Sequence, residues 1–119
     1  MEQKFCPYFF LSLSTLFPAL FSCYNKAMNN IELKDGERVN QLFSSDVKII
    51  QNREVFSYSI DSVILSRFTK LHNRGLIVDL CAGNGAVGLF ASTRTKANIV
   101  GVEIQERNAE MAESSIQLN

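Results

Sequence analysis

Two apolar runs in the C-terminal half form the strongest pattern in the chain. Residues 76–81 and 97–104 are almost continuously apolar, which is typical of parallel β-strands covered on both faces. A glycine-rich stretch and an apolar helical pattern around 89–91 separate them, and a polar helix is expected over about 105–118. The order strand, glycine loop, helix, strand, helix predicts a βαβ unit and an α/β fold.

The last helix has two distinct faces. Apolar positions at i, i+3 and i+7 predict its buried side, and the charged positions between them predict a solvated side. The apolar residues are Ala109, Ala112 and Ile116, and the charged ones are Glu106, Arg107, Glu110 and Glu113.

The middle of the chain predicts a β-hairpin followed by a helix. Apolar and polar residues alternate over 46–50, and 51–53 supply turn residues before the apolar pair 55–56. A helical pattern follows, with Asp61 as the expected N-cap. Its apolar positions are Ile64, Phe68 and Leu71.

Residues 1–27 differ in composition from the rest of the chain. They hold both prolines, two of the three cysteines, five of the nine phenylalanines and only three charges, whereas the other 92 residues carry 21 charges. The uncharged run 5–24 is long enough for a transmembrane helix, but Pro7 and Pro18 interrupt it. We interpret residues 1–27 as upstream sequence outside the fold, with Met28 as the working start. A membrane or export segment and a structured extension are the alternatives.

Length, charge and cysteines limit the possible classes. A chain of 119 residues supports one small domain at most. Twelve basic and twelve acidic side chains give zero net charge, which lacks the footprint of a strongly basic nucleic-acid binder. The three cysteines have no pattern that predicts a disulfide scaffold or paired zinc ligands. His72, the only histidine, is expected to be solvated in a loop.

The glycines fit two templates for nucleotide binding. Gly83, Gly85 and Gly88 satisfy the dinucleotide pattern GxGxxG, and Glu103 lies 20 residues beyond Gly83. This spacing permits a nicotinamide or flavin enzyme. Asp79 competes with that interpretation, because an acid inside a strand is costly unless it has hydrogen-bond partners. An acid at this position would organise the backbone amides of the loop or reach a positively charged ligand.

The run VDLCAGNGAVG at residues 78–88 resembles the cofactor loop of class I S-adenosylmethionine-dependent methyltransferases. In that loop an acid is followed by glycines at the second, fourth and sixth positions. This chain has Cys81, Gly83 and Gly85 there, and Cys81 is expected to be a small packing residue. The sequence from about 30 to 119 is similar to the front part of bacterial tRNA1(Val) adenine N6-methyltransferases. The resemblance implies a Rossmann-like fold truncated after about two parallel strands, preceded by a β-hairpin and a helix. It divides the chain at residues 1–27 and 28–119.

The resemblance also implies a cofactor and its site. The cofactor would be S-adenosyl-L-methionine, with the loop around its methionine portion. Glu103 would bind the ribose hydroxyls, and Ile104 would lie against adenine. The cofactor-binding residues are then Asp79, Cys81, Gly83, Asn84, Gly85, Glu103 and Ile104. No metal ligand is expected.

The resemblance assigns no catalytic residue to this chain. Adenine N6 transfer in the family uses an Asn-Pro-Pro-Tyr type motif, and no proline follows Pro18. We therefore expect a fragment that binds cofactor weakly, with tRNA as the substrate of the full-length relative. A cytoplasmic protein is expected, with membrane contact only if residues 5–24 form a real anchor. The alternatives are a fragment of an NAD-dependent oxidoreductase and a membrane-tethered protein without enzymatic activity.

Overall fold

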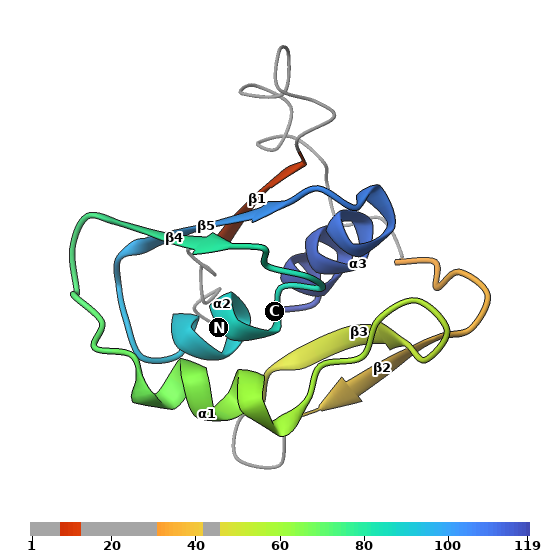
Figure 1. Ribbon diagram of the computed structural model, residues 1–119, viewed down its shortest axis with the longest axis horizontal. Coiled ribbons are helices and arrows are strands. Elements are labelled where there is room, and N and C mark those ends of the chain that lie inside the picture. The colour runs from red at the N-terminus through yellow and green to blue at the C-terminus, as the bar shows by residue number, and fades with distance from the viewer. Residues whose placement is uncertain (1–7, 13–30, 42–45) are drawn as a thin grey trace, which may run out of the picture.

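A computed structural model of the chain describes residues 8–12, 31–41 and 46–119. These residues form a small α/β arrangement with a β-hairpin, three helices and a short parallel sheet (Figure 1). The elements are β1 (Tyr8–Ser12), β2 (Glu37–Gln41), β3 (Lys48–Asn52), α1 (Ile60–Phe68), β4 (Leu76–Leu80), α2 (Ala86–Ser92), β5 (Asn98–Glu103) and α3 (Glu106–Gln117).

The βαβ unit predicted from the apolar runs is confirmed. Strands β4 and β5 are parallel neighbours, with Val78 opposite Val100 and Leu80 opposite Val102. Helix α2 connects them, and α3 follows β5. Both strands therefore end at the same edge of the sheet, where the glycine loop begins.

The coverage on both faces that the apolar run 76–81 indicated is absent from one face of β4. Helices α2 and α3 lie on one side of the sheet in Figure 1. On the other face of β4, Leu76, Val78 and Leu80 are 63%, 51% and 72% exposed. The apolar run alone did not reveal this, because continuous hydrophobicity indicates burial without showing which elements provide it.

Strand β1 adds a third member to the parallel sheet. The strand order is β1-β5-β4, with Tyr8 opposite Ile99 and Ser12 opposite Glu103. The interpretation of residues 1–27 as upstream sequence did not anticipate this pairing. The rest of that segment, including most of the apolar run 5–24, lies outside the described residues, as does Met28.

The predicted hairpin exists, but its strand partner differs. β3 pairs with the upstream strand β2, with Glu37 opposite Asn52 and Gln41 opposite Lys48. The predicted partner at 55–56 makes only an isolated bridge, between Asn52 and Phe56. The alternation over 46–50 thus predicted a strand correctly, whereas the turn-like residues 51–53 pointed to the wrong partner.

Helix α1 begins two residues earlier than expected. Its N-cap is Ser59, whose side chain accepts the amide N–H of Asp61, so the prediction of Asp61 as N-cap is wrong. The predicted apolar face is wrong at Ile64 and Phe68, which are 56% and 85% exposed, whereas Leu71, beyond the end of the helix, packs against the core. The helix instead buries Val63 and Ser66.

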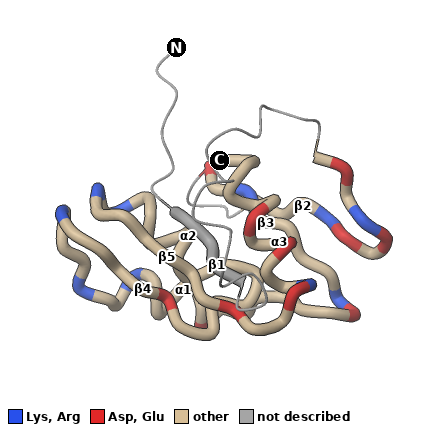
Figure 2. Tube along the Cα trace, turned by 90° about the horizontal axis from the view of Figure 1, so that it is seen from above, with Lys and Arg blue, Asp and Glu red and all other residues tan. Residues whose placement is uncertain are grey.

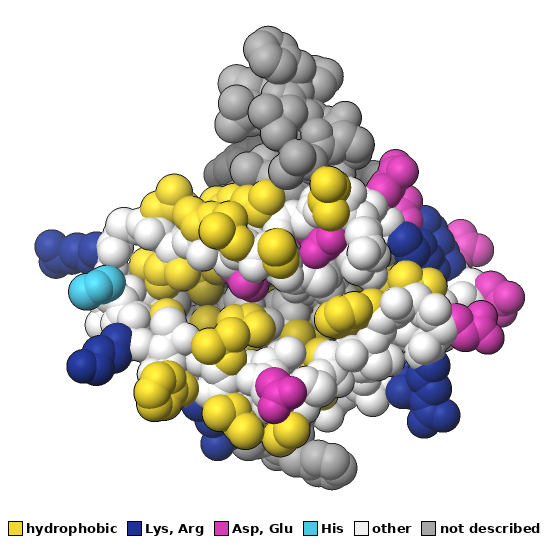
Figure 3. Space-filling view, in the orientation of Figure 1, with side chains coloured by type: hydrophobic (Ala, Val, Ile, Leu, Met, Phe, Trp, Pro, Cys, Tyr) yellow, Lys and Arg dark blue, Asp and Glu magenta, His cyan; other side chains and the backbone are white. Residues whose placement is uncertain are grey.

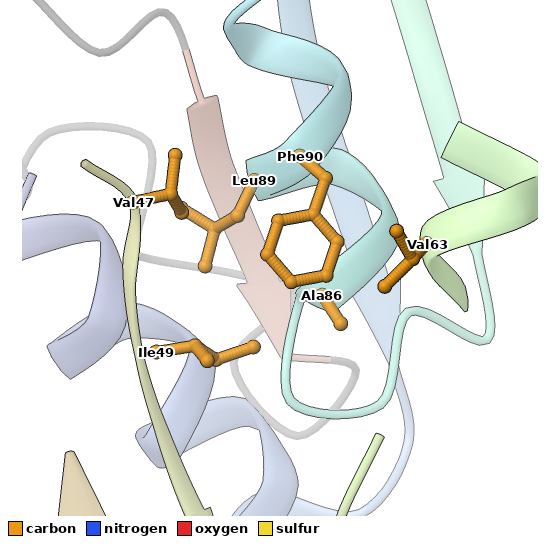
Figure 4. Close-up of a cluster of buried hydrophobic side chains, with 6 residues drawn as sticks. All are labelled: Val47, Ile49, Val63, Ala86, Leu89 and Phe90. Carbon is orange, nitrogen blue, oxygen red and sulfur yellow. The ribbon is translucent and has the colours of Figure 1, made fainter. Parts of the chain in front are cut away.

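One apolar cluster joins the hairpin to α1 and α2 (Figure 4). Tyr58 packs at its edge, with its ring perpendicular to that of Phe90 and the centroids 5.3 Å apart. This cluster fixes the segment before α1 against the helix that follows the glycine loop. Its buried members are Val47, Ile49, Val63, Ala86, Leu89 and Phe90.

Helix α3 packs with the apolar face that its sequence predicted. Ala109 and Ala112 are buried, and Ile116 packs against the core. The opposite face was expected to be solvated, but two of its charged side chains form ion pairs with another segment. Arg107 pairs with the nearly buried carboxylate of Glu37 at 2.7 Å, and Glu110 pairs with Lys34 at 2.6 Å. These ion pairs join α3 to the segment that leads into the hairpin.

Candidate functional site

The candidate site lies where β4 and β5 end and the glycine loop leads into α2. Three alternate positions of this loop have positive φ, namely Cys81 at 56°, Gly83 at 59° and Gly85 at 81°. Glycine adopts this conformation at little cost, so Gly83 and Gly85 allow the tight path of the loop. Ligands of open α/β sheets bind at this carboxyl edge of the strands.

Glu103 closes the loop onto the end of β5. One carboxylate oxygen accepts the backbone N–H of Gly83 at 2.8 Å, and the other accepts the N–H of Gln105 at 2.9 Å. The residue is only 6% exposed. Glu103 is therefore not a solvated charge at a strand end but an anchor for two backbone amides.

Asp79 holds the start of α2. Its Oδ2 atom accepts the N–H of Gly88 at 3.1 Å. The N-cap residue Gly85 has no side chain to cap the helix, so Asp79 in β4 accepts one of the first-turn amides that have no partner within the helix. This geometry agrees with the interpretation that an acid in this strand organises backbone amides.

Asn84 connects the loop to the hairpin. Its side-chain Nδ2 donates to the carbonyl of Ile50 at 3.0 Å, and the amide of Ile50 donates to Ser115 at 2.8 Å. Asn84 is completely buried, and its Oδ1 is an acceptor without a hydrogen-bond partner among the described residues. The loop is thus fixed from β4, β5 and β3, and it retains one unused buried acceptor.

Phe56 is a neighbour of the site that the sequence did not reveal. Its ring lies so close to Gly83 that a Cβ atom added there would approach Cε1 and Cζ at 3.1 Å. Phe56 is 38% exposed, and it lies four residues before α1 begins at Ile60. The only local signal for it was an apolar residue ahead of the helix, which does not distinguish a site from a core.

Cys81 differs from its expected role. It is exposed, and its φ of 56° is unusual for a residue with a side chain, so the prediction of a small packing residue is wrong. The position requires a left-handed backbone more than it requires a small side chain. That requirement explains why a glycine would suit this position better.

The rim of the site is apolar and exposed. Ile104 follows Glu103 directly and is 73% exposed, and Leu80 beside Cys81 is 72% exposed. Figure 3 shows apolar side chains gathered along the side of the molecule that carries the sheet. The structure therefore brings the predicted residues to one edge, where Glu103 binds the amide of Gly83, Asp79 binds the amide of Gly88, and Ile104 lies at the surface.

Two curated proteins are similar to part of this chain, whereas no protein-family profile matches it. They are the tRNA1(Val) (adenine(37)-N6)-methyltransferases of Shewanella sp. strain W3-18-1 and Shewanella putrefaciens strain CN-32. Each is 39% identical over 51 residues, which is 43% of this chain and 21% of the relative. The matched stretch is shorter than the range 30–119 over which the resemblance was expected. These similarities support a relationship to methyltransferases over part of the chain.

The described part of the chain places no three His, Cys, Asp or Glu side chains where they could hold a metal ion. Within the same residues, no helix has both the length and the apolar character to cross a membrane.

Proposed function

We propose that this chain binds S-adenosylmethionine as part of a methyltransferase of Rossmann-like fold. The hydrogen bond between the Glu103 carboxylate and the Gly83 amide carries the proposal, because it places a carboxylate beside a glycine loop at the carboxyl edge of parallel strands. The partial similarity to methyltransferases favours this cofactor over other nucleotides.

The residues at this edge suit the adenosyl part of the cofactor. A carboxylate has about four acceptor positions, so Glu103 retains acceptors for ribose hydroxyls after it binds two amides. Exposed Ile104 offers an apolar surface to an adenine ring. The unpartnered Oδ1 of Asn84 adds one buried acceptor to the loop.

The names of the two relatives suggest an adenine in tRNA as the methyl acceptor. S-adenosylmethionine would supply the methyl group from its sulfonium when bound. In such a direct transfer the protein contributes mainly by holding the donor and acceptor in the reactive geometry. An adenine paired or stacked in RNA must leave its stack to reach the cofactor. The residues of this chain would provide the donor side of that arrangement.

A nicotinamide cofactor is the competing ligand, because Gly83, Gly85 and Gly88 also fit the dinucleotide pattern. Asp79 argues against it. In the structure this acid occupies β4 and accepts the amide of Gly88, so a carboxylate takes up one of the amide donors of the α2 N-terminus, where a dinucleotide would place its negatively charged pyrophosphate.

Calorimetry on the full chain distinguishes the two cofactors. We expect S-adenosylhomocysteine to bind and NAD to give no heat of binding. Replacing Ile104 with Ser should weaken binding several-fold, because it removes apolar contact worth about 1 kcal/mol. Leu76→Ser is the matched control, since Leu76 is comparably exposed but lies at the opposite end of β4. Binding of NAD alone would overturn the proposal.

A further inference from the structure

Although the chain has no net charge, one end of the folded molecule is strongly basic. Between Asp61 and Glu103 there are five Lys and Arg residues and a single acid, Asp79. All five cations are exposed, and Figure 3 shows basic side chains and the histidine at one end of the molecule, with most acidic side chains toward the other end. The five are Arg67, Lys70, Arg74, Arg94 and Lys96.

Hydrogen bonds fix this basic end in one arrangement. Arg94 donates to the carbonyls of Ser66 and Thr69 at the end of α1. The amide of Asn98 donates to the carbonyl of Gly75 at 3.0 Å. The loops before β4 and before β5 are therefore held side by side, as Figures 1 and 2 also show. Thr95 adds a hydrogen bond to the carbonyl of His72.

Three of the five cations at this end form no ion pair within the described residues. The ion pairs between described side chains that involve Glu37 and Glu110 lie at the other side of the molecule. Lys70, Arg74 and Lys96 are exposed, and none of them pairs with a carboxylate of the described chain. An anionic partner could bind them without first displacing an internal ion pair.

Helix α1 connects this basic end to the candidate cofactor loop. Phe56, close to the start of the helix, packs against Gly83, and Thr69, just after its end, is bound by Arg94. Exposed apolar side chains run along the helix at i, i+4 and i+8 between these points. They are Ile60, Ile64 and Phe68, which are 68%, 56% and 85% exposed.

We propose that Lys70, Arg74 and Lys96 bind the phosphate backbone of an RNA substrate. Cations combined with an exposed aromatic ring are typical of surfaces that bind unpaired nucleic acid, where rings stack on bases. Phe68, which is 85% exposed and lies two residues before Lys70, provides such a ring. The five residues of β4 span roughly 16 Å, so a bound RNA would reach from this end to the carboxyl edge of the sheet. The choice of RNA over other polyanions rests on the proposed function.

Fluorescence anisotropy with labelled bacterial tRNA and the full chain tests this surface. We expect Lys70→Glu combined with Lys96→Glu to weaken binding by roughly tenfold or more, and to reduce the salt slope by about one per lost phosphate contact. The matched control is Lys48→Glu with Arg53→Glu, which makes the same change in net charge on the exposed hairpin. The control pair should change affinity less than about twofold, since surface charges away from the contact act only through screened long-range attraction.

Three results would overturn the proposal. The first is no binding of tRNA by the unmodified chain, and the second is an equal effect of both variant pairs. The third is binding to phosphatidylserine vesicles without binding to tRNA, which would identify a membrane surface instead. Calorimetry with S-adenosylhomocysteine keeps the two proposals separate, because the Lys70 and Lys96 changes should leave its affinity unchanged. For the Lys70 and Lys96 variant we expect weaker tRNA binding with unchanged binding of S-adenosylhomocysteine.

Discussion

The carboxylate of Glu103 accepts the backbone N–H of Gly83 at 2.8 Å, across 20 positions of sequence. This contact ties the end of β5 to the loop that follows β4. Because the nearly buried Glu103 side chain holds the amide of Gly83, the loop conformation depends on Glu103 even before any ligand binds. Stability and binding measurements on Glu103 therefore report on two different roles of one side chain.

Replacing Glu103 with Gln should destabilise the protein. The amide side chain keeps only one acceptor oxygen, so the N–H of Gly83 or that of Gln105 loses its partner. A buried donor left unpaired costs about 1–3 kcal/mol, which urea unfolding would detect. Glu113→Gln is the control, because Glu113 is exposed and a surface change there should stay within about 0.5 kcal/mol. Equal stability of both variants would mean that Glu103 does not hold the loop.

Replacing Cys81 with Gly should stabilise the protein. A left-handed φ costs a residue with a side chain about 1–2 kcal/mol, and part of this gain is offset by the greater freedom of glycine in the unfolded chain. We expect a net increase of about 0.5–1 kcal/mol in the free energy of unfolding. Cys81→Ala keeps the Cβ atom and should show no such increase. A stabilisation by Ala equal to that by Gly would contradict the backbone explanation.

The Lys34–Glu110 pair should make a small, pH-dependent contribution to stability. The hydrogen bond from Lys34 lowers the pKa of Glu110 from its ordinary value of 4.5. A lowered pKa in the folded state means that the stabilisation is present above the ordinary pKa and is lost as the pH falls through the lowered one. Both side chains are about half exposed, so solvent limits the contribution to about 0–1 kcal/mol.

Urea unfolding of Glu110→Gln checks this sign. The variant should be slightly less stable than the unmodified chain at about pH 7, and the difference should vanish below the lowered pKa. High salt at neutral pH should reduce the difference as well. A difference that grows in acid would contradict the assignment.

Removing residues 1–27 should lower the thermal midpoint by several degrees, because β5 would lose the strand that pairs with it over five residues. Circular dichroism of the full chain and of a chain that starts at Met28 would measure this. An unchanged midpoint would instead favour the interpretation that residues 1–27 are upstream sequence outside the fold.

The parts of the fold that the sequence predicts well are those fixed by local pattern. The stripe of Ala109, Ala112 and Ile116 faces the core as its spacing requires, and the glycine loop lies between two parallel strands. Helix α1 shows where local pattern fails. Ile64 and Phe68 have the spacing of a buried face, yet α1 packs through Val63 and Ser66, where Arg94 from another loop also binds.

In the candidate site, too, local sequence pattern predicts some features and misses those that depend on contacts between distant segments. The positions of Gly83 and Gly85 could be predicted, because the loop needs positive φ at alternate residues. The ring of Phe56 over Gly83 and the link from Asn84 to Ile50 could not, because both join segments that are far apart in sequence and lack a motif. The ion pair between Arg107 and Glu37 escaped prediction for the same reason.

The most direct test of the cofactor site is a titration of the isotope-labelled full chain with S-adenosylhomocysteine, followed by NMR amide shifts. We predict the largest shifts for residues 83–85 and 103–104, and little change for the loops at 70–75 and 93–97 at the opposite end of the sheet. NAD added at the same concentration should leave the spectrum unchanged. Shifts confined to the opposite end, or no shifts with saturating S-adenosylhomocysteine, would contradict the account.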